Sequence, residues 1–199
     1  HSALNRLQVR SLYKQTRKYK KELALYYHSC CSEPDYNEKY IFIALHYQPE
    51  ETTVPSAGIY YDQLMMLNNL SISIPENWKI YLKEHPTQFH PNYEGECSRD
   101  TTFYDDILKH DNIKILDTKI ESFKLIDNSQ MVVTLTGTVG FEAILRGKPV
   151  LIFGNAWYSY CHGVFNINSI NDIKSAINTI RDGFVIDQNK IKSFLHVIL

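Results

Sequence analysis

The stretch LTGTVGFEAILRGKPVLIFG, residues 135–154, holds the residues best suited to chemistry. An apolar run ends in Thr136-Gly137-Thr138, a helix is expected to begin there, and Glu142 follows Thr138 by one helical turn. The first N–H groups of a helix have no partner inside it, and the helix dipole favours an anion at that end. With hydroxyl donors from Thr136 and Thr138, this junction predicts a phosphate site.

Gly137 and Gly140 are expected to let the backbone approach a ligand closely. Glu142 could accept two hydrogen bonds from vicinal sugar hydroxyls, such as those of a ribose. The alternative is structural: Thr138 caps the helix and Glu142 completes a capping-box pairing. Spacing alone leaves both open. The stretch is neither a Walker loop nor a G-x-G-x-x-G dinucleotide motif.

A second polar element, His85-Pro86, comes directly after the apolar run 78–83. Pro86 fixes the direction of the chain, so His85 would stand at the edge of a sheet with a donor for a phosphate or a base. A structural or merely exposed loop histidine is the alternative.

His46 and Glu50 form a third polar element, a His/carboxylate pair at another strand end that is suited to acid–base work. A hydrogen-bonded turn around Pro49 is the alternative. We expect no metal site, because the other histidines lack ligand-like spacing and Asp105-Asp106 diverge on a helix.

Apolar runs that alternate with helical patterns position these residues. Strands are expected at 40–45, 78–83, 112–116, 131–135 and 148–153. Such alternation predicts a parallel sheet with helices on both faces, an α/β, Rossmann-like domain over residues 40–199. In these sheets ligands bind beyond the carboxyl ends of the strands, where the polar residues above gather.

Residues 1–31 are expected to form a separate basic helical segment or linker helix. Its basic residues, opposed only by Glu22, are Arg6, Arg10, Lys14, Arg17, Lys18, Lys20 and Lys21. The plain interpretation is a solvated face or a helix that crosses between domains. The sharper one is contact with an acidic membrane surface, a polyanionic glycan or a capsule-assembly partner.

The whole composition is that of a globular protein. The 199 residues are 44% hydrophobic and 22% charged, with a net charge of -1, which gives no general attraction to nucleic acid. No apolar run is long enough to span a bilayer, and four cysteines without metal or redox spacing favour reduced thiols. We therefore expect a cytoplasmic protein, with peripheral contact at the inner membrane as the alternative. Because the chain opens on His1, we expect a piece of a longer protein.

Three quoted blocks, in this order, resemble the capsule polysaccharide biosynthesis family of GT-B-type glycosyltransferases over about residues 40–166. They are LHYQPEETTVPSAGIYYDQ, YLKEHPTQF and TLTGTVGFEAILRGKPVLIFGNAWY. A more distant resemblance is to the non-hydrolysing UDP-N-acetylglucosamine 2-epimerases. Thr136-Gly137-Thr138 and the single Glu142 stand where epimerases usually carry Asp-Ser-Gly-Gly and paired glutamates.

The resemblance implies one half of a GT-B fold, the C-terminal half that binds the donor, with the N-terminal domain missing. It places a nucleotide or its phosphate at His85 and Pro86, a phosphate at Thr136, Gly137 and Thr138, and the ribose or sugar hydroxyls at Glu142. His46, Gln48 and Glu50 would face the cleft between the domains, with Glu50 or His46 as the candidate catalytic base.

The sequence thus predicts a glycosyltransferase domain for bacterial capsule or surface polysaccharide. Its expected partners are a nucleotide-sugar donor and a glycan acceptor, with no cofactor and no metal. Two alternatives stay open. One is a sugar-nucleotide epimerase, and the other is a non-catalytic module that binds nucleotide sugar or glycan.

Overall fold

The computed structural model describes residues 6–49, 60 and 62–198, in which seven strands form one sheet. The strands are β1 Cys31–Ser32, β2 Lys39–Ala44, β3 Trp78–Lys83, β4 Ile113–Leu116, β5 Met131–Thr134, β6 Val150–Ile152 and β7 Val164–Asn166. The α-helices are α1 Arg6–Ser29, α2 Gln63–Ser71, α3 Thr101–Leu108, α4 Ser122–Asn128, α5 Thr138–Leu145, α6 Ile170–Arg181 and α7 Gln188–Ile198. Two short 3-10 helices, η2 Pro86–Phe89 and η3 Gly95–Cys97, follow β3.

All neighbouring strands are parallel, in the order β1-β4-β3-β2-β5-β6-β7. From β2 the chain moves outward through β3 to β4, then returns to the other side of β2 and moves outward again from β5 to β7. The direction changes between β2 and β5, and the carboxyl ends of strands at such a switch point are where open α/β sheets bind ligands. The expected α/β, Rossmann-like fold is confirmed.

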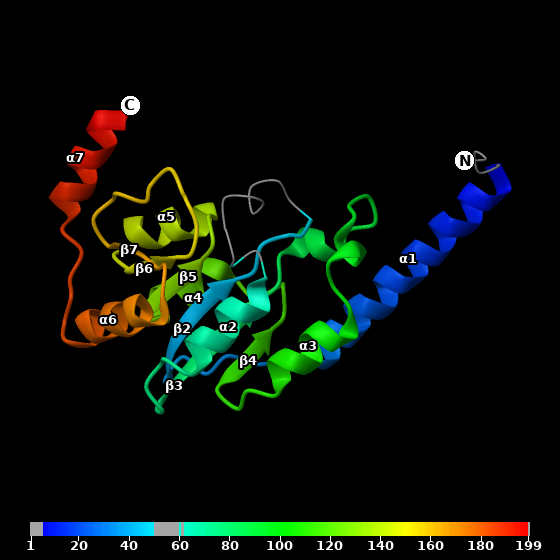
Figure 1. The fold of residues 1–199 in the computed structure, drawn as a ribbon, viewed down its shortest axis with the longest axis horizontal. Coiled ribbons are helices and arrows are strands. Elements are labelled where there is room, and N and C mark those ends of the chain that lie inside the picture. The colour runs from blue at the N-terminus through cyan, green and yellow to red at the C-terminus, as the bar shows by residue number, and fades with distance from the viewer. Residues whose placement is uncertain (1–5, 50–59, 61, 199) are drawn as a thin grey trace.

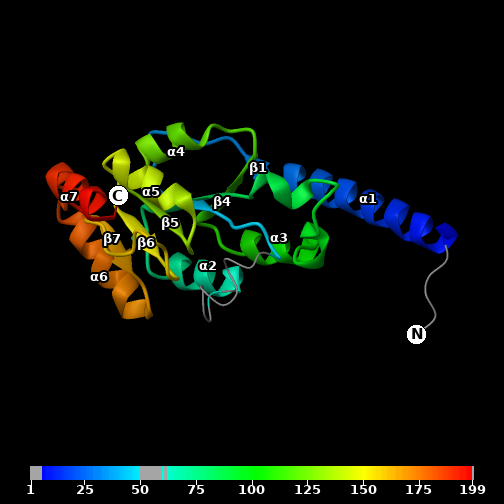
Figure 2. The same cartoon turned by 90° about the horizontal axis from the view of Figure 1, so that it is seen from above.

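Helices cover both faces of the sheet (Figure 2). Helices α2, α3 and α6 lie on one face and α4 and α5 on the other, and each face has its own apolar core. The central strand β2 serves both cores, because successive side chains point to opposite faces. Ile41 and Ile43 enter one core, while Tyr40 and Phe42 enter the other.

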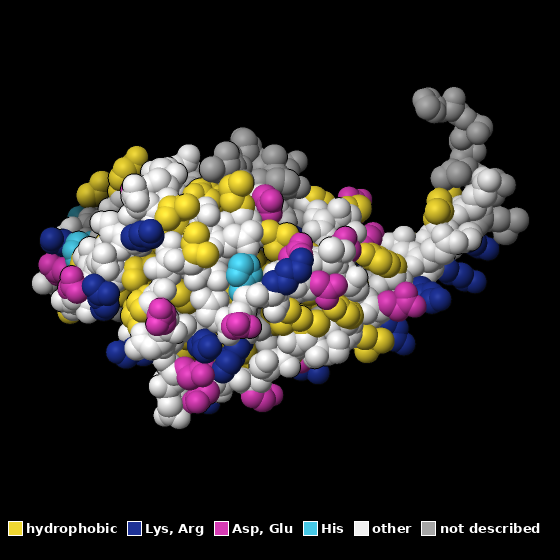
Figure 3. Space-filling view, turned by 60° about the horizontal axis from the view of Figure 1, so that its bottom comes forward, with side chains coloured by type: hydrophobic (Ala, Val, Ile, Leu, Met, Phe, Trp, Pro, Cys, Tyr) yellow, Lys and Arg dark blue, Asp and Glu magenta, His cyan; other side chains and the backbone are white. Residues whose placement is uncertain are grey.

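Helix α1 packs against the rest of the described domain through its C-terminal part. Leu23 and Tyr27 are buried in the core, whereas the N-terminal half projects from the body of the protein (Figure 1) and leaves Val9, Leu12 and Tyr13 exposed. Basic side chains gather along this projecting part (Figure 3). None of the helices within the described residues has the length and apolar character needed to cross a membrane.

Strands β1 and β7 are the elements that the apolar pattern does not predict. The Cys-Ser pair of β1 lies in a polar stretch, yet it extends the sheet by pairing with Ile115 and Leu116 of β4. Strand β7 has three partly exposed residues at the opposite edge. Edge strands this short bury too little apolar surface to leave a recognisable alternation.

Candidate functional site

A cleft of about 610 Å³ opens at the carboxyl ends of β2, β3 and β5, across the switch point of the sheet. Of the residues predicted from the sequence, those that line it are His46, His85, Pro86, Thr136, Gly137, Thr138 and Glu142. The structure therefore brings together residues from three separate loops, as the sheet order requires. Further lining residues that the sequence did not single out include Lys83, Glu84, Ser122 and Asn155.

Helix α5 begins in this cleft with unpaired backbone donors. Gly137 is its N-cap and no side chain caps it, so the capping role considered for Thr138 is not the one that the structure shows. Within the described residues, the N–H groups of Thr138 and Val139 have no hydrogen-bond partner, and both residues line the cleft. Two such donors at the positive end of a helix are suited to an anion.

Glu142 lies one turn further along α5 and also lines the cleft. Within the part of the chain that the structure describes, no hydrogen bond of its carboxylate to Thr138 or to the N-cap closes a capping box. Glu142 thus borders the same space as the unpaired donors at the start of α5. This is the arrangement expected for a group that binds hydroxyls next to a phosphate.

His46 supports the turn that precedes α5. Its buried ring nitrogen Nε2 lies 3.2 Å from the amide nitrogen of Leu135, 3.3 Å from that of Thr136 and 2.9 Å from Oγ1 of Thr134. Because two backbone N–H groups donate to Nε2, that nitrogen carries no proton and the ring is neutral. Burial, together with the nearby His85 and Arg99, lowers the pKa of His46 to about 4.

Gly137, which lines the cleft, and Gly140, in the first turn of α5, both lie close to protein groups, a contact that the sequence does not predict. A Cβ on Gly137 would lie 2.9 Å from Oγ1 of Thr134 and 3.0 Å from Cε1 of His46. A Cβ on Gly140 would lie 2.3 Å from the hydroxyl oxygen of Tyr158, which is buried and donates to the carbonyl of Gly137. Both glycines thus allow the supporting side chains to reach the turn from behind.

Gly140→Ala should lower the free energy of unfolding by roughly 1–3 kcal/mol, because the added methyl group overpacks against Tyr158. Urea unfolding followed by circular dichroism measures the change. Tyr158→Phe removes the clashing oxygen, so the same glycine substitution should cost less in that background. A stabilised Gly140→Ala protein, as the higher helix propensity of alanine alone would give, would contradict this packing.

His85 and Pro86 stand on the β3 side of the cleft. His85 is the N-cap of η2, and its Nδ1 accepts the N–H of Thr87 at 3.2 Å. The proton of the neutral ring is therefore on Nε2, which makes the exposed end of this ring a donor. Pro86 is the first residue of η2, where its fixed φ is favourable.

A family model for "Capsule polysaccharide biosynthesis protein" matches residues 5–192 of this chain, nearly its whole length. The chain belongs to the capsule polysaccharide biosynthesis family.

The similarity of this chain to individual relatives covers a smaller part of their length. Capsule polysaccharide modification protein LipA of Neisseria meningitidis serogroup A is 29% identical over 80 residues, which are 40% of this chain and 10% of LipA. KpsC of Thermosulfurimonas dismutans, a beta Kdo 2,7 transferase, has a TM-score of 0.52 and 19% identity over 81% of this chain and 52% of its own.

The UDP-GlcNAc 2-epimerase of Methanocaldococcus jannaschii has a TM-score of 0.55 and 13% identity, over 92% of this chain and 50% of its own. The capsule-family chain therefore spans about half the length of either solved structure. The two likenesses show the shared GT-B-like fold of the domain.

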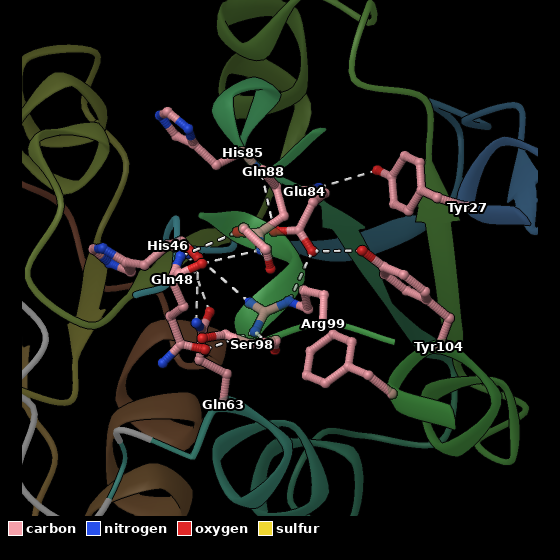
Figure 4. A network of polar contacts seen from close by, with 12 residues as sticks. Tyr27, His46, Gln48, Gln63, Glu84, His85, Gln88, Ser98, Arg99 and Tyr104 are labelled. Carbon is pink, nitrogen blue, oxygen red and sulfur yellow. Dashed lines mark hydrogen bonds and ion pairs between the residues drawn. The ribbon is translucent and has the colours of Figure 1, made fainter. Parts of the chain in front are cut away.

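Beneath the cleft of this capsule-family domain lies a buried ion pair that the sequence did not reveal (Figure 4). Nε of Arg99 lies 3.0 Å from Oε2 of Glu84, and both side chains are almost fully inaccessible to solvent. The guanidinium also donates to Oε1 of Gln48 at 2.6 Å and to the carbonyl of His46 at 3.3 Å. Tyr104 donates its hydroxyl to the same carboxylate oxygen at 3.0 Å.

Two glutamine side chains hold the backbone of the loop after β2. The amide of Gln63 accepts the N–H of His46 at 3.0 Å and donates to its carbonyl at 3.3 Å. In the same way the amide of Gln88 accepts from the N–H of Gln48 at 3.0 Å and donates to its carbonyl at 3.1 Å. Each side chain thus pairs with one residue as a neighbouring strand would.

Gln48 therefore lies within this buried network and is not among the residues that line the cleft, whereas the resemblance implies that it faces the cleft between the two GT-B domains. Glu50, the other candidate for the catalytic base, lies outside the residues that the structure describes. No spacing rule connects Arg99 with Glu84, since the two are joined only through the folded loops. Arg99 is flanked by Ser98 and Asp100 in a polar stretch, so nothing in its local sequence indicates that its side chain is buried.

The far side of the cleft is aromatic. Trp157 lines it and is 54% exposed, with its ring centroid 4.5 Å from that of Phe141. Tyr158 is buried beneath the turn, and Tyr160 is 90% exposed. Of these three aromatic side chains, Trp157 is the one that lines the cleft. Within the described residues, no three His, Cys, Asp or Glu side chains converge as metal ligands.

Proposed function

We propose that the cleft binds a nucleotide-activated sugar, and that the chain is the donor-binding half of a glycosyltransferase for capsule or related surface polysaccharide. The observation that carries this proposal is the start of α5, where the N–H groups of Thr138 and Val139 open into the cleft beside Glu142. Membership of the capsule family supports it, as does the GT-B-like fold.

Each part of the cleft has a role in this proposal. The start of α5, with the hydroxyls of Thr136 and Thr138, receives the phosphate, and Glu142 accepts hydrogen bonds from ribose or sugar hydroxyls. His85 donates from Nε2 to the nucleotide, and Trp157 stacks on a ring. In the reaction the anomeric carbon exchanges its bond to a phosphate oxygen for one to an acceptor oxygen. The phosphate leaves with the electron pair, and the acceptor proton passes to a base.

The base that we propose first is Glu50, with His46 as the other candidate. The Nε2 lone pair of His46 already accepts from the turn before α5, so this ring acts chiefly as a positioning group. Stabilisation of the leaving phosphate by fixed backbone donors supplies the main electrostatic contribution, and we propose no metal requirement. The companion N-terminal domain and the glycan acceptor complete the active site in this scheme.

Helix α1 stays a candidate contact with an acidic membrane surface or with a capsule-assembly partner. Its projecting half is basic and leaves Val9, Leu12 and Tyr13 exposed, which fits either a peripheral membrane contact or an interdomain helix. We propose a peripheral location at the cytoplasmic face of the inner membrane.

Calorimetric titration of the chain with CMP, UDP, GDP and ADP tests the donor site. One nucleotide should bind most tightly, and Glu142→Gln should weaken it by about tenfold, the usual worth of a hydrogen bond to a charged group. Glu76→Gln provides the control, since Glu76 is exposed at the opposite end of β3. Binding that is indifferent to Glu142, or no binding even to the full-length enzyme, would refute the assignment.

An epimerase is the second candidate, favoured by the fold likeness to the UDP-GlcNAc 2-epimerase over 92% of the chain. Incubation of the full-length enzyme with its nucleotide sugar, without acceptor, separates the two reactions. Recovery of an epimerised nucleotide sugar would support the epimerase. A donor that stays intact alone and is consumed once a glycan acceptor is added would support the transferase. A donor that does not react under either condition would support the non-catalytic binding module.

A further inference from the structure

Lys83 is the last residue of β3, and it lines the cleft while only 7% of its surface is exposed. Its ammonium group donates to the carbonyl of Ile120 at 2.8 Å and to the hydroxyl of Ser122 at the start of α4. An ammonium group has three N–H donors. Two are thus directed at neutral oxygens, and no further acceptor is found among the described residues.

The charge of Lys83 has no carboxylate partner within the described part of the chain. The other two buried lysine and arginine residues there do have one, because Lys20 pairs with Glu96 and Arg99 with Glu84. Glu84 follows Lys83 directly, but its carboxylate is held by Arg99 in the network beneath the cleft. Burial accordingly lowers the pKa of Lys83, with no opposing contribution from a nearby acid.

A buried cation that is solvated only by neutral oxygens is costly, and an anion placed beside it offsets that cost. The cleft is the open space next to this ammonium group, so a bound ligand is the natural source of the anion. Removing water on ligand binding would further strengthen the attraction, because the local dielectric falls.

We propose that Lys83 binds an oxyanion of the ligand, on the β3 side of the cleft. The inference deepens the proposed nucleotide-sugar site and rests on it. Strand β2 lies between β3 and β5. Lys83 pairs with Ala44 and lies level with the end of β5, so two strand spacings of about 4.8 Å, roughly 10 Å, separate it from that strand end. The oxyanion is either a phosphoryl group of the nucleotide or a carboxylate on its sugar.

Calorimetry of the 199-residue chain tests this proposal by comparing CMP, UMP, GMP and AMP with their uncharged nucleosides. Wild type should prefer a monophosphate, and Lys83→Gln should reduce that preference by about tenfold or more, since it removes the charge but keeps an N–H donor for Ile120 and Ser122. General damage to the fold would weaken the binding of nucleosides and of nucleotides to the same extent. A second arm compares the binding of UDP-glucuronate with that of UDP-glucose. If wild type prefers UDP-glucuronate and Lys83→Gln loses that preference, the oxyanion that Lys83 binds is the carboxylate of the sugar.

Lys148→Gln is the matched control. Lys148 is also partly buried, its ammonium group donates to a backbone carbonyl, that of Ser129, and burial lowers its pKa, but it precedes β6 at the opposite end of the sheet. Its replacement should change either preference less than twofold. Lys83→Met repeats the test if Lys83→Gln does not fold.

The outcomes also separate this inference from the proposed function. One outcome is nucleotide binding that depends on Glu142 while Lys83→Gln keeps the full preference for monophosphates and for UDP-glucuronate. That result overturns the inference about Lys83 and still supports the nucleotide site. Binding of inorganic pyrophosphate that depends on Lys83, without binding of any nucleotide, supports Lys83 as an oxyanion ligand but overturns the nucleotide or its sugar as the source of that oxyanion, together with the nucleotide-sugar site. A wild-type chain with no oxyanion preference at all overturns the role of Lys83.

Discussion

Arg99→Met should lower the free energy of unfolding by about 3–5 kcal/mol, because it leaves the carboxylate of Glu84 buried without its cation. The same change removes the donors that hold Gln48 and the carbonyl of His46. Urea unfolding of the variant and of wild type, at the same pH and salt, measures the loss. Ligand affinity in the cleft should fall as well, since Glu84 also accepts the N–H of His85.

Two companions make this test specific. Arg99→Met combined with Glu84→Gln should recover part of the stability, because neither charge is then left unpaired. Arg146→Met removes one partner of an exposed ion pair with Asp127, and it should change stability little, as surface pairs do. Equal losses at Arg99 and Arg146, or a double variant no better than the single one, would show that the buried pair is not what holds the loops.

Acidification should cost the protein about 2 kcal/mol of stability between pH 7.5 and pH 5 through His46 alone. In the folded protein the pKa of His46 is lowered to about 4 from its ordinary 6.5. Above about pH 6.5 the ring is neutral whether the chain is folded or unfolded, so it contributes no pH dependence. As the pH falls below that value the unfolded chain binds a proton and the folded chain does not, and stability declines until about pH 4.

The measurement is the midpoint and slope of urea unfolding at several pH values from 7.5 to 5. His46→Gln should remove this part of the pH dependence, although it also lowers stability throughout by weakening the turn before α5. Gly140→Ala, which changes stability without altering a titratable group, should keep the wild-type dependence of stability on pH. If the stability of His46→Gln depends on pH as strongly as that of wild type, the His46 ring does not stay neutral in the folded state.

The fold was largely predictable because its strands are short apolar runs with helical patterns between them. Strand β3, Trp78–Lys83, coincides with the expected range, since all but one of its residues are buried and the apolar run is clear. The cleft was predictable for a related reason: parallel strands bring the residues after each strand to one edge of the sheet. His46, His85 and Glu142 therefore meet there although they are distant in sequence.

What the sequence did not provide is the support beneath the cleft. Glu84 and Arg99 are joined by loops whose paths no local pattern specifies, and Gln48 proved to belong with them. For Gly137 and Gly140 the sequence predicts a close approach to a ligand, because the sequence context cannot show that the side chains of His46 and Tyr158 pack against these two glycines. The sequence indicates only that Lys83 ends the expected strand 78–83, since its lack of an acidic partner is visible only once the neighbouring helices are placed.

The pairing of Gln63 and Gln88 with the backbone of His46 and Gln48 has a consequence for the entropy of ligand binding. A loop next to a binding site commonly becomes ordered only when the ligand arrives, and that ordering subtracts from affinity. Here side chains from α2 and η2 already pair with the backbone of His46 and Gln48, so these two residues become ordered when the chain folds. The floor of the cleft is thus a pre-organised surface, and selectivity among ligands rests on the groups above it.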